Sequence, residues 1–207
     1  KTGAGTLTLA NADSNFTGDL AIDEGRVDAT AGHNNTNPTS ALGHPTTPGR
    51  QIIVGSGTTL GFGVNDVFGN ATSSPTTAIV VNGGTVTNNG NFYNTLGPLT
   101  LNGGMLTAIG GANANYQAFR LFGTVTVAGT TGSTIATSGP NSGLHLVANT
   151  NFVVPNVTSS AAADLTISAV LLNQSPLGGA TGGLTKTGDG TLVLNSASIY
   201  TGPTNIN

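Results

Sequence analysis

The amino-acid sequence predicts an all-β fold, a parallel β-solenoid whose coils stack along a rod. The first observation behind this prediction is that the chain repeats itself, because the segment Lys1–Leu9, KTGAGTLTL, returns as Lys186–Leu194, KTGDGTLVL. The second is a shorter pattern that recurs several times between these two copies. Self-similarity of both kinds is typical of repeat architectures, in which each unit buries its apolar face against its neighbours.

The shorter pattern has the form apolar-x-apolar-x-x-Gly-x-apolar. It occurs at Leu20–Val27, Ile79–Val86 and Leu99–Leu106, with looser versions at Ile52–Leu60 and Val125–Ile135. Apolar residues that alternate with period two lie on one face of a strand. Glycine between two such strands permits a sharp corner, because it adopts backbone angles that other residues avoid. The pattern therefore predicts two short strands, a corner and a looser return in each coil.

Successive copies of the pattern also predict a register. We expect Val81 to stack on Leu101 with both side chains pointing inward, because the pleat of a strand fixes which face each residue occupies. Gly84 should lie over Gly104 at a corner. Parallel stacking is favoured over an antiparallel sandwich, the fold of many binding modules, because the pattern returns in the same direction after 20 residues.

The elements follow from this pattern in chain order, within one β-helix segment spanning residues 1–207. Residues 1–29 read as a strand, a corner and two more strands, and residues 30–50, 61–77 and 109–120 as loop excursions without periodicity. No stretch has the helical period, and Gly111–Phe119 is the only place where one helical turn could fit. Nine or ten coils at about 4.8 Å each would make a rod of roughly 45 Å. The other strands are expected at Ile52–Val54, Thr58–Leu60, Ile79–Val81, Thr85–Thr87, Leu99–Leu101, Met105–Ala108, Thr124–Val127, Ser133–Ile135, Leu144–Val147, Phe152–Val154, Leu165–Ile167, Val170–Leu172 and Thr191–Leu194.

Composition excludes several classes of protein. Only 6% of the 207 residues are charged, the net charge is −3, and the five basic residues are scattered, so nucleic acid is not an expected partner. An apolar content of 37% is enough for a core, yet no apolar run approaches the roughly 18 residues that span a membrane. The absence of cysteine excludes disulfides, thiol catalysis and zinc–thiolate sites.

The segment from Gly182 to Ile206 resembles the passenger-associated transport repeat, also called the autotransporter-associated β-strand repeat. That family's pattern is approximately G-L-x-K-x-G-x-G-T-L-x-L, a short polar stretch, then Y-x-G-x-T-x-I. The C-terminal copy has Leu184, Lys186, Gly188, Gly190, Thr191, Leu192, Leu194, Tyr200, Gly202, Thr204 and Ile206 at the anchor positions. The N-terminal copy has Lys1, Gly3, Gly5, Thr6, Leu7, Leu9, Gly18 and Ile22, with Phe16 and Leu20 replacing the tyrosine and the threonine.

This resemblance implies a right-handed parallel β-helix in a large secreted or surface-displayed bacterial protein. The translocator barrel that many members carry is not in this sequence, which leaves the export route open. The sequence has no initiator methionine, tag or signal peptide, so we expect it to be a piece of a longer repetitive chain. We expect more β-helix at both ends, covalently or by end-to-end stacking of identical subunits.

The densest ionic patch consists of Asp19, Asp23, Glu24, Arg26 and Asp28. Four carboxylates within ten residues could supply oxygen ligands for Ca²⁺. The favoured interpretation is a solvated edge of the coil, partly neutralised by Arg26.

Asp164 and Asp189 lie 25 residues apart and could stack on neighbouring coils. Polysaccharide-cleaving enzymes need two carboxylates at a defined separation, or a carboxylate beside a base. The nearest base, Lys186, belongs to the repeat, so we expect a structural role for both aspartates.

His33, His44 and His145 are each isolated in the sequence and are expected on surface loops. Asn82 and Asn102 hold matching positions one coil apart and predict a short internal asparagine ladder. Aromatic residues in or beside irregular segments could contact glycans or proteins, but are expected to pin loops onto the side of the solenoid. These aromatics are Phe62, Phe68, Phe92, Tyr93, Tyr116, Phe119 and Phe122.

The function predicted from the sequence is a structural or adhesive segment of an extracellular bacterial surface or fibre-forming protein. The excursions are its expected contacts with host or matrix glycans or proteins. We predict no catalytic residue, no bound cofactor and no metal. The alternative is a polysaccharide-active or glycan-binding β-helix protein, which so few charged residues disfavour.

Overall fold

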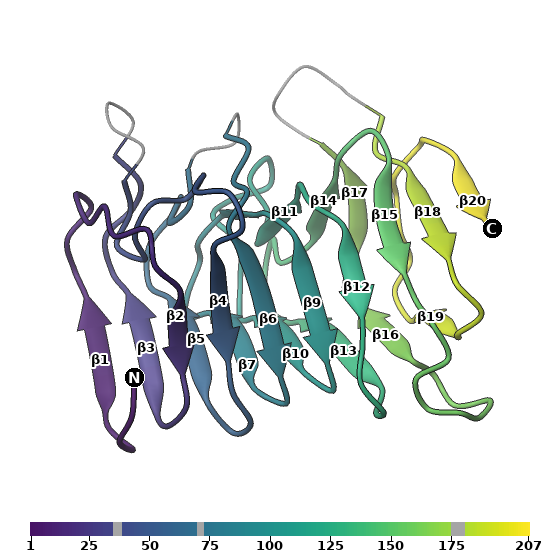
Figure 1. Ribbon diagram of the computed structural model, residues 1–207. Coiled ribbons are helices and arrows are strands. Elements are labelled where there is room, and N and C mark those ends of the chain that lie inside the picture. Colours follow the sequence, from purple (N-terminus) through teal and green to yellow (C-terminus); the bar gives the residue numbers. More distant parts are fainter. Residues whose placement is uncertain (35–38, 70–72, 175–180) are drawn as a thin grey trace.

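The coil direction and the pairing of the strands define the fold. The computed structural model describes residues 1–34, 39–69, 73–174 and 181–207, and within these ranges all the pairings between strands are parallel and no helix is present. In Figure 1 the chain descends through the front sheet, ascends through the back sheet and advances from left to right, so the coil is right-handed. The predicted all-β, right-handed parallel β-helix is confirmed.

Two long sheets form the walls of the rod, and each has eight strands in the described ranges. The first sheet contains β1 (Thr6–Leu9), β3 (Arg26–Ala29), β5 (Thr59–Phe62), β7 (Thr85–Asn88), β10 (Met105–Ala108), β13 (Ser133–Thr137), β16 (Leu165–Ser168) and β19 (Leu192–Leu194). The second contains β2 (Leu20–Ile22), β4 (Gln51–Val54), β6 (Ala78–Asn82), β9 (Leu99–Asn102), β12 (Val125–Val127), β15 (Thr150–Val153), β18 (Leu184–Thr187) and β20 (Thr204–Ile206). Eight coils in the described ranges replace the nine or ten predicted, and at about 4.8 Å per coil they make a rod of roughly 38 Å.

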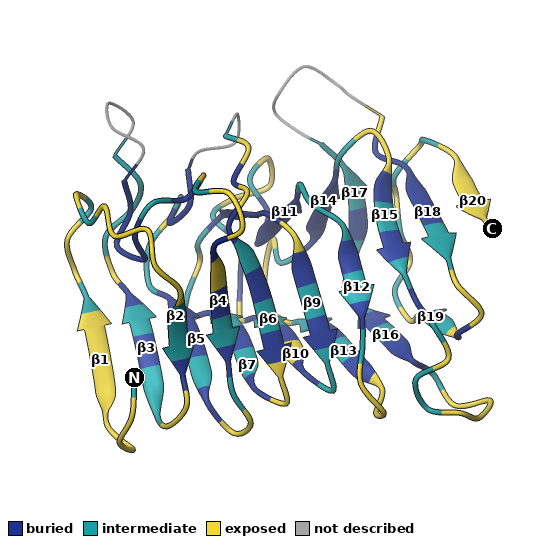
Figure 2. Cartoon of the chain, in the orientation of Figure 1, coloured by how far each residue is buried: buried dark blue, intermediate teal, exposed yellow. Residues whose placement is uncertain are grey.

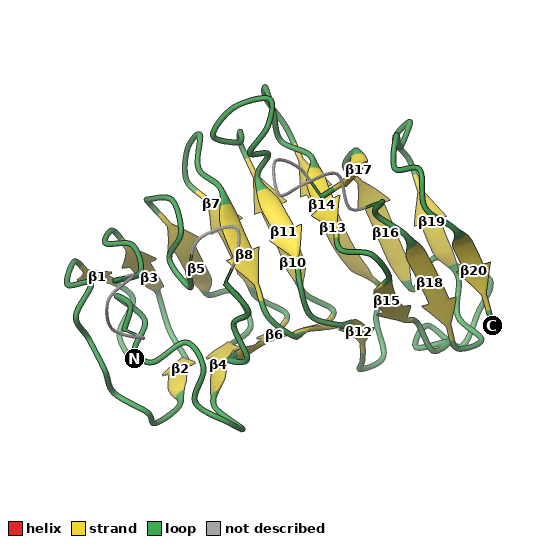
Figure 3. Ribbon diagram, turned by 90° about the horizontal axis from the view of Figure 1, so that it is seen from above, coloured by secondary structure: helices red, strands yellow, loops and turns green. Residues whose placement is uncertain are grey.

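A third sheet accounts for this difference. From the fourth to the seventh coil, the return from the first sheet to the second carries a strand of its own. These strands are β8 (Asn94–Leu96), β11 (Phe119–Leu121), β14 (Leu144–Leu146) and β17 (Leu171–Asn173). Figure 3 looks down on this side of the rod. The segments predicted as strands near residues 144 and 170 therefore form a third wall and add no coils.

Two of the excursions have bounds that differ from the prediction. β5 extends through Phe62, so the irregular passage after it starts at Gly63. β11 begins at Phe119, inside the range predicted as the third excursion. The segment Gly111–Phe119, the one place where a helical turn could fit, contains bends and no helical turn.

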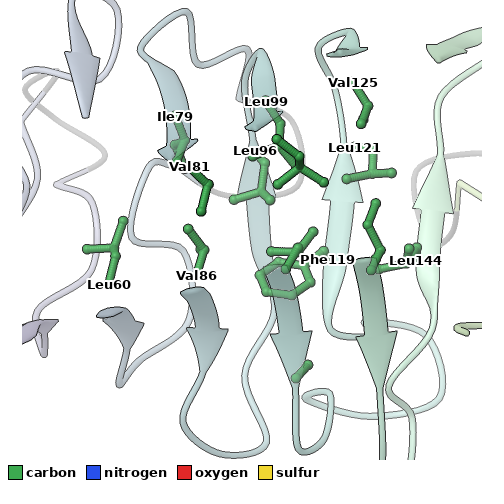
Figure 4. Packing of buried hydrophobic residues seen from close by; sticks show 14 of the residues in the cluster. Leu60, Ile79, Val81, Val86, Leu96, Leu99, Phe119, Leu121, Val125 and Leu144 are labelled. Atoms are coloured by element: carbon green, nitrogen blue, oxygen red, sulfur yellow. The ribbon is translucent and has the colours of Figure 1, made fainter. Parts of the chain in front are cut away.

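The core is a set of inward-facing apolar columns that run along the rod. Val81 pairs with Leu101 in parallel strands, and both side chains are fully buried, as the spacing predicts. Ile79 and Leu99 continue the next column. Figure 4 shows Ile79, Val81 and Leu99 of the second sheet together with buried side chains of the other two sheets, such as Val86 and Leu96. Burial at about 25 cal/mol per Å² of apolar surface makes these columns the main source of stability.

The corners between the second and first sheets are tight. Gly83 and Gly103 have φ angles of 72° and 61°, a left-handed conformation that disfavours residues with a Cβ atom. The pairs Asn82↔Asn102 and Thr85↔Met105 bracket these corners, so Gly84 lies over Gly104 as predicted.

The terminal coils are the most exposed part of the walls, and Figure 2 shows β1 and β20 as predominantly exposed. In the described part of the chain no helix is suited to crossing a membrane.

Candidate functional site

Lys1 and Lys186 hold equivalent places in the two copies of the end repeat. Nζ of Lys186 donates to the carbonyl oxygen of Gly188 at 2.5 Å, and Nζ of Lys1 donates to the carbonyl oxygen of Gly3. Both glycines have positive φ angles, 84° at Gly3 and 86° at Gly188, and both begin the corner that leads into the first sheet. The Lys-x-Gly of the repeat is therefore a clamp on this corner.

The acidic patch predicted near the N-terminus does not gather into one site. Asp19 accepts a hydrogen bond from the first backbone amide of β4 at 2.8 Å. Glu24 accepts one from a backbone amide near the N-terminus at 2.6 Å. Asp23 is exposed, and Asp28 forms an ion pair with Arg26 at 2.8 Å. No cluster of three potential metal ligands occurs within the described ranges, and the geometry supports the interpretation as a coil edge.

The Arg26–Asp28 pair is part of a small arch on the outer face of the first sheet. Nη2 of Arg26 donates to Oδ1 of Asn89 at 2.6 Å, and Nδ2 of Asn89 donates to Oδ1 of Asp28 at 3.0 Å. Gly61 lies between them, and a Cβ atom there would come within 2.1 Å of Asp28 Oδ1. The missing side chain of Gly61 therefore lets these groups join across three strands.

Asp164 ties a long corner to the wall. Its side chain is fully buried and accepts hydrogen bonds from the amides of Thr158 at 2.8 Å and Thr191 at 2.7 Å. Burial alone raises the pKa of Asp164, but these hydrogen bonds lower it below its usual value. Asp189 is exposed and accepts a hydrogen bond from the amide of Asn156 at 3.1 Å. Both carboxylate oxygens of Asp164 therefore accept hydrogen bonds from backbone amides.

The histidines are not all on surface loops. His33 and His44 are half-buried in the first excursion. His145 lies in β14 and is only 1% exposed, so the prediction of a surface loop is wrong for this residue. Its side chain points to the outer face of the third sheet, where returning chain segments cover it.

The aromatic side chains pin the returns onto the walls. Phe62 contacts Phe68 edge-on with ring centroids 5.9 Å apart, and Phe119 at 6.3 Å. Tyr93 and Tyr116 pack edge-on at 5.4 Å. Edge-to-face pairs of this kind add about 0.5–1.5 kcal/mol to the burial of each ring. The expectation that the aromatics anchor loops fits this geometry.

The outer face of the third sheet carries a buried polar ladder, formed by Thr95, Arg120 and His145. Arg120 pairs with Thr95 on one side and with His145 on the other, and all three are at least 95% buried. The residues on either side of them in each strand are buried and point to the core, and all of these except Asn94 are apolar. This polar ladder was not predicted from the sequence. The triplets Phe-Arg-Leu and Leu-His-Leu, in which one polar residue stands between two apolar ones, are the signal that could have revealed it.

Arg120 has few partners for a buried guanidinium. Nη1 donates to the carbonyl oxygen of Ser73 at 2.9 Å, and the group lies 4.9 Å from the ring centroid of Phe122. Nε is buried and has no hydrogen-bond partner in the described part of the chain. Burial lowers the pKa of Arg120, with a smaller opposing effect of Tyr93. An arginine nevertheless stays charged at every ordinary pH.

Asp66 and Tyr93 lie beside this ladder. Burial raises the pKa of Tyr93 to about 12 and that of Asp66 to about 6. Oδ1 of Asp66 is buried and has no hydrogen-bond partner within the described residues. The backbone of Asp66 has a φ angle of 57°. This backbone, in contrast to the side chain, joins three segments. Its carbonyl oxygen accepts a hydrogen bond from the amide of His33 at 2.7 Å, and its amide donates one to the carbonyl oxygen of Tyr93 at 2.9 Å.

Arg50, like Arg120, is a buried arginine that donates hydrogen bonds to backbone carbonyl oxygens, in this case in the first excursion. It is only 2% exposed, and its guanidinium donates to the carbonyl oxygens of Gly18, at 2.9 Å, and Leu42. It also lies over the ring of Phe16 at 4.9 Å from the centroid. Arg50 and Arg120, two of the basic residues that look scattered in the sequence, are thus buried and donate hydrogen bonds to carbonyl oxygens of the returns.

The predicted asparagine ladder forms, but outside the core. Nδ2 of Asn102 donates to Oδ1 of Asn82 at 3.4 Å, and the two residues pair across β6 and β9. Asn82 is exposed and Asn102 half-buried. The ladder is external because both asparagines lie one residue beyond an inward-facing position.

Comparison with known families supports the assignment of the repeats. The family model of the passenger-associated transport repeat matches residues 1–29 and 184–207. These two segments hold β1 to β3 and β18 to β20, so each end of the rod is one such repeat. No significant match was found among curated proteins or solved structures. The repeat and the parallel β-helix together fit a passenger segment of an autotransporter.

Proposed function

We propose that this chain is a structural and adhesive rod segment of an extracellular bacterial surface or fibre-forming protein. The observation that carries this proposal is the open core at both ends of the rod. Leu7 and Phe16 are 39% and 40% exposed at the N-terminal end, and Leu194, Ile199 and Ile206 are 39%, 63% and 75% exposed at the other. Val27, which pairs with Leu7, and Ile167, which pairs with Leu194, are fully buried one coil further in. An apolar cross-section of this kind fits a further coil.

The architecture suits a protein that has to extend over a long distance. Each coil contacts only its neighbours, so every added coil lengthens the rod and brings its own stabilising contacts. The two end repeats place their corner lysines in the same geometry seven coils apart, because β1 and β19 are the first and eighth strands of the first sheet.

We propose that more β-helix continues this segment at both ends, in a longer chain or by stacking of identical subunits. The free edges of β1 and β20 offer unpaired backbone groups to such a coil. With 6% charged residues, the chain has little repulsion to oppose the contact.

The adhesive part of the proposal rests on the returns from the first sheet to the second. They all leave the walls on one side of the rod, whereas the opposite side has corners that are mostly short. Segments that differ in length and composition from coil to coil give this side a surface that can vary without disturbing the walls. Host or matrix glycans and proteins are the proposed partners.

Catalysis is not part of the proposal. The alternative of a polysaccharide-active enzyme would need two available carboxylates, and Asp164 is engaged with two backbone amides. Incubation with neutral and acidic polysaccharides, with and without Ca²⁺, should give no cleavage. Cleavage that disappears in Asp164→Asn or Asp189→Asn would establish the enzyme.

Electron microscopy of the intact protein released from its cells tests the proposed function directly. We expect a thin rod or filament much longer than this segment. Short, monodisperse particles with covered ends would contradict it.

A further inference from the structure

Residues 112–117 form a strap that lies over the outer face of the third sheet. The ring of Tyr116 packs edge-on against Tyr93, at 5.4 Å between centroids. The carbonyl oxygen of Asn115 lies 3.1 Å from Nε2 of His145. Gln117 is nearly buried, and its Oε1 accepts a hydrogen bond from the amide of Gly143 at 3.0 Å. The strap thus contacts the sheet mainly at His145 and at residues next to it.

His145 is held between the strap and the last strand of the third sheet. Nδ1 lies 2.6 Å from the carbonyl oxygen of Asn173, a contact that requires the proton on this nitrogen. Nε2 faces the amide of Gln117 at 3.4 Å as well as the carbonyl oxygen of Asn115. In the neutral ring Nε2 therefore accepts from Gln117, and Nδ1 donates to Asn173.

The charges around His145 oppose its protonation. Burial lowers its pKa, the two backbone carbonyls act in the opposite direction, and Arg120 lowers it further, with a net pKa below 6.5. Arg120 is the directly paired residue of the neighbouring strand, so an imidazolium would be a second buried cation about 5 Å along the ladder. Tyr93 faces the ring from the segment before β8, Tyr116 extends this contact from the strap, and β17 contributes Leu172. In the described ranges His145 has no carboxylate ion-pair partner.

We propose that residues 112–117 are an acid-sensitive strap, closed over the third sheet while His145 is neutral and released when its ring takes up a proton. When the strap is released, the imidazolium of His145 becomes accessible to water and is no longer buried beside Arg120. Release also exposes Tyr93 and His145, which the closed strap contacts through Tyr116 and Asn115. This inference does not depend on the proposed rod function, since it concerns one coil.

The sign of the effect follows from linkage. A histidine whose pKa is lowered in the closed form contributes stability above pH 6.5, and this contribution is lost as the pH falls toward the lower value. Between these two pKa values the equilibrium constant for opening increases by about tenfold per pH unit. Below the lower one it stays constant.

Hydrogen exchange of the full chain, corrected for intrinsic exchange rates, provides the test at about pH 7.5 and about pH 4.5. We expect amides of the strap to lose protection at the lower pH, by about tenfold for each unit between 6.5 and the pKa of His145 in the closed form, while β9 and β12 in the wall keep theirs. In His145→Gln, which is neutral at both values, the difference should vanish. The matched control His44→Gln, in the first excursion, should behave like the natural protein.

Two further measurements keep the inference falsifiable if His145→Gln folds poorly. Titration of the ring of His145 by NMR in the natural protein should give a pKa below 6.5, and a value above it would overturn the proposal. Arg120→Gln removes the neighbouring cation, so its strap should lose less protection in acid than that of the natural protein. Equal loss in His145→Gln and in the natural protein, or no loss in either, would also overturn it.

Discussion

Asn94 donates a hydrogen bond from Nδ2 to Oδ1 of Asn88 at 3.0 Å, inside the rod and with both side chains fully buried. Asn88 uses its own amide hydrogens for the carbonyl oxygens of Phe92 and Ala118, at 2.8 and 2.9 Å. Asn94 accepts from the amide of Val67 at 2.8 Å. The pair thus satisfies the backbone of three segments that leave the walls, and it fixes where the third sheet begins.

Replacing Asn94 by leucine should destabilise the protein by about 3 kcal/mol or more. The substitution leaves Oδ1 of Asn88 and the amide of Val67 buried without partners, at a cost of about 1–3 kcal/mol each. Denaturant unfolding of Asn94→Leu measures the loss. Asn91→Ala, at an exposed position nearby, is the control and should change the unfolding free energy by less than about 0.5 kcal/mol. An Asn94→Leu protein as stable as the control would refute the role of the pair.

The inward column predicts a sharp asymmetry within β9. Leu101→Asp places an unpaired charge among fully buried apolar side chains, which costs several kcal/mol and should unfold the neighbouring coils. Thr100→Asp, one residue earlier on the outer face, should be tolerated. Circular dichroism and thermal unfolding of the two variants compare them directly, and equal effects would contradict the register.

The arch over Gly61 predicts an unusual cost for a single methyl group. Gly61→Ala forces apart Arg26, Asp28 and Asn89, so we expect a loss of about 1–3 kcal/mol. The same substitution in an Asn89→Ala background should cost less, because the arch is already broken there. Equal costs in the two backgrounds would show that the arch is not what Gly61 accommodates.

Asp66 should make the natural protein less stable at neutral pH than in mild acid. Burial raises its pKa to about 6, so the folded state favours the protonated form, and stability falls as the pH rises from about 4 to about 6. Asp66→Asn removes this penalty and should stabilise the protein at neutral pH by about 1–2 kcal/mol. Asparagine also tolerates the φ angle of 57° at this position.

The exposed Asp23→Asn is the matched control for Asp66→Asn and should leave the pH profile of the unfolding free energy unchanged. A profile of Asp66→Asn that parallels the natural one would contradict the assignment.

The walls of the rod could be predicted from the sequence because their signal is local. Val81 and Leu101 sit at equivalent places in a repeated pattern, and a glycine corner follows each, so spacing alone determines both register and direction. The end repeats could also be predicted from the sequence, because Lys1 and Lys186 stand in nearly identical segments.

The third sheet and its polar ladder were harder to predict. The strands around Arg120 and His145 are three residues long, too short for a period of two to stand out. A histidine between two leucines looks like an isolated residue until the coil stacks it on an arginine 25 residues away. Burial of Asn88 depends in the same way on partners as distant as Ala118. Such contacts follow from how the returns fold back, and no local pattern in the sequence encodes them.

The central claim is that this segment is one stretch of a continuous β-helix. Its most direct test is a chain in which residues 1–185 are followed by residues 1–207, which places Lys1 of the second copy where Lys186 stands now. Small-angle X-ray scattering should show one rod longer by about 34 Å, the length of seven added coils at about 4.8 Å each, and thermal unfolding should occur in a single transition at a higher Tm. Two bodies that move independently, with the Tm of the single segment, would contradict the account.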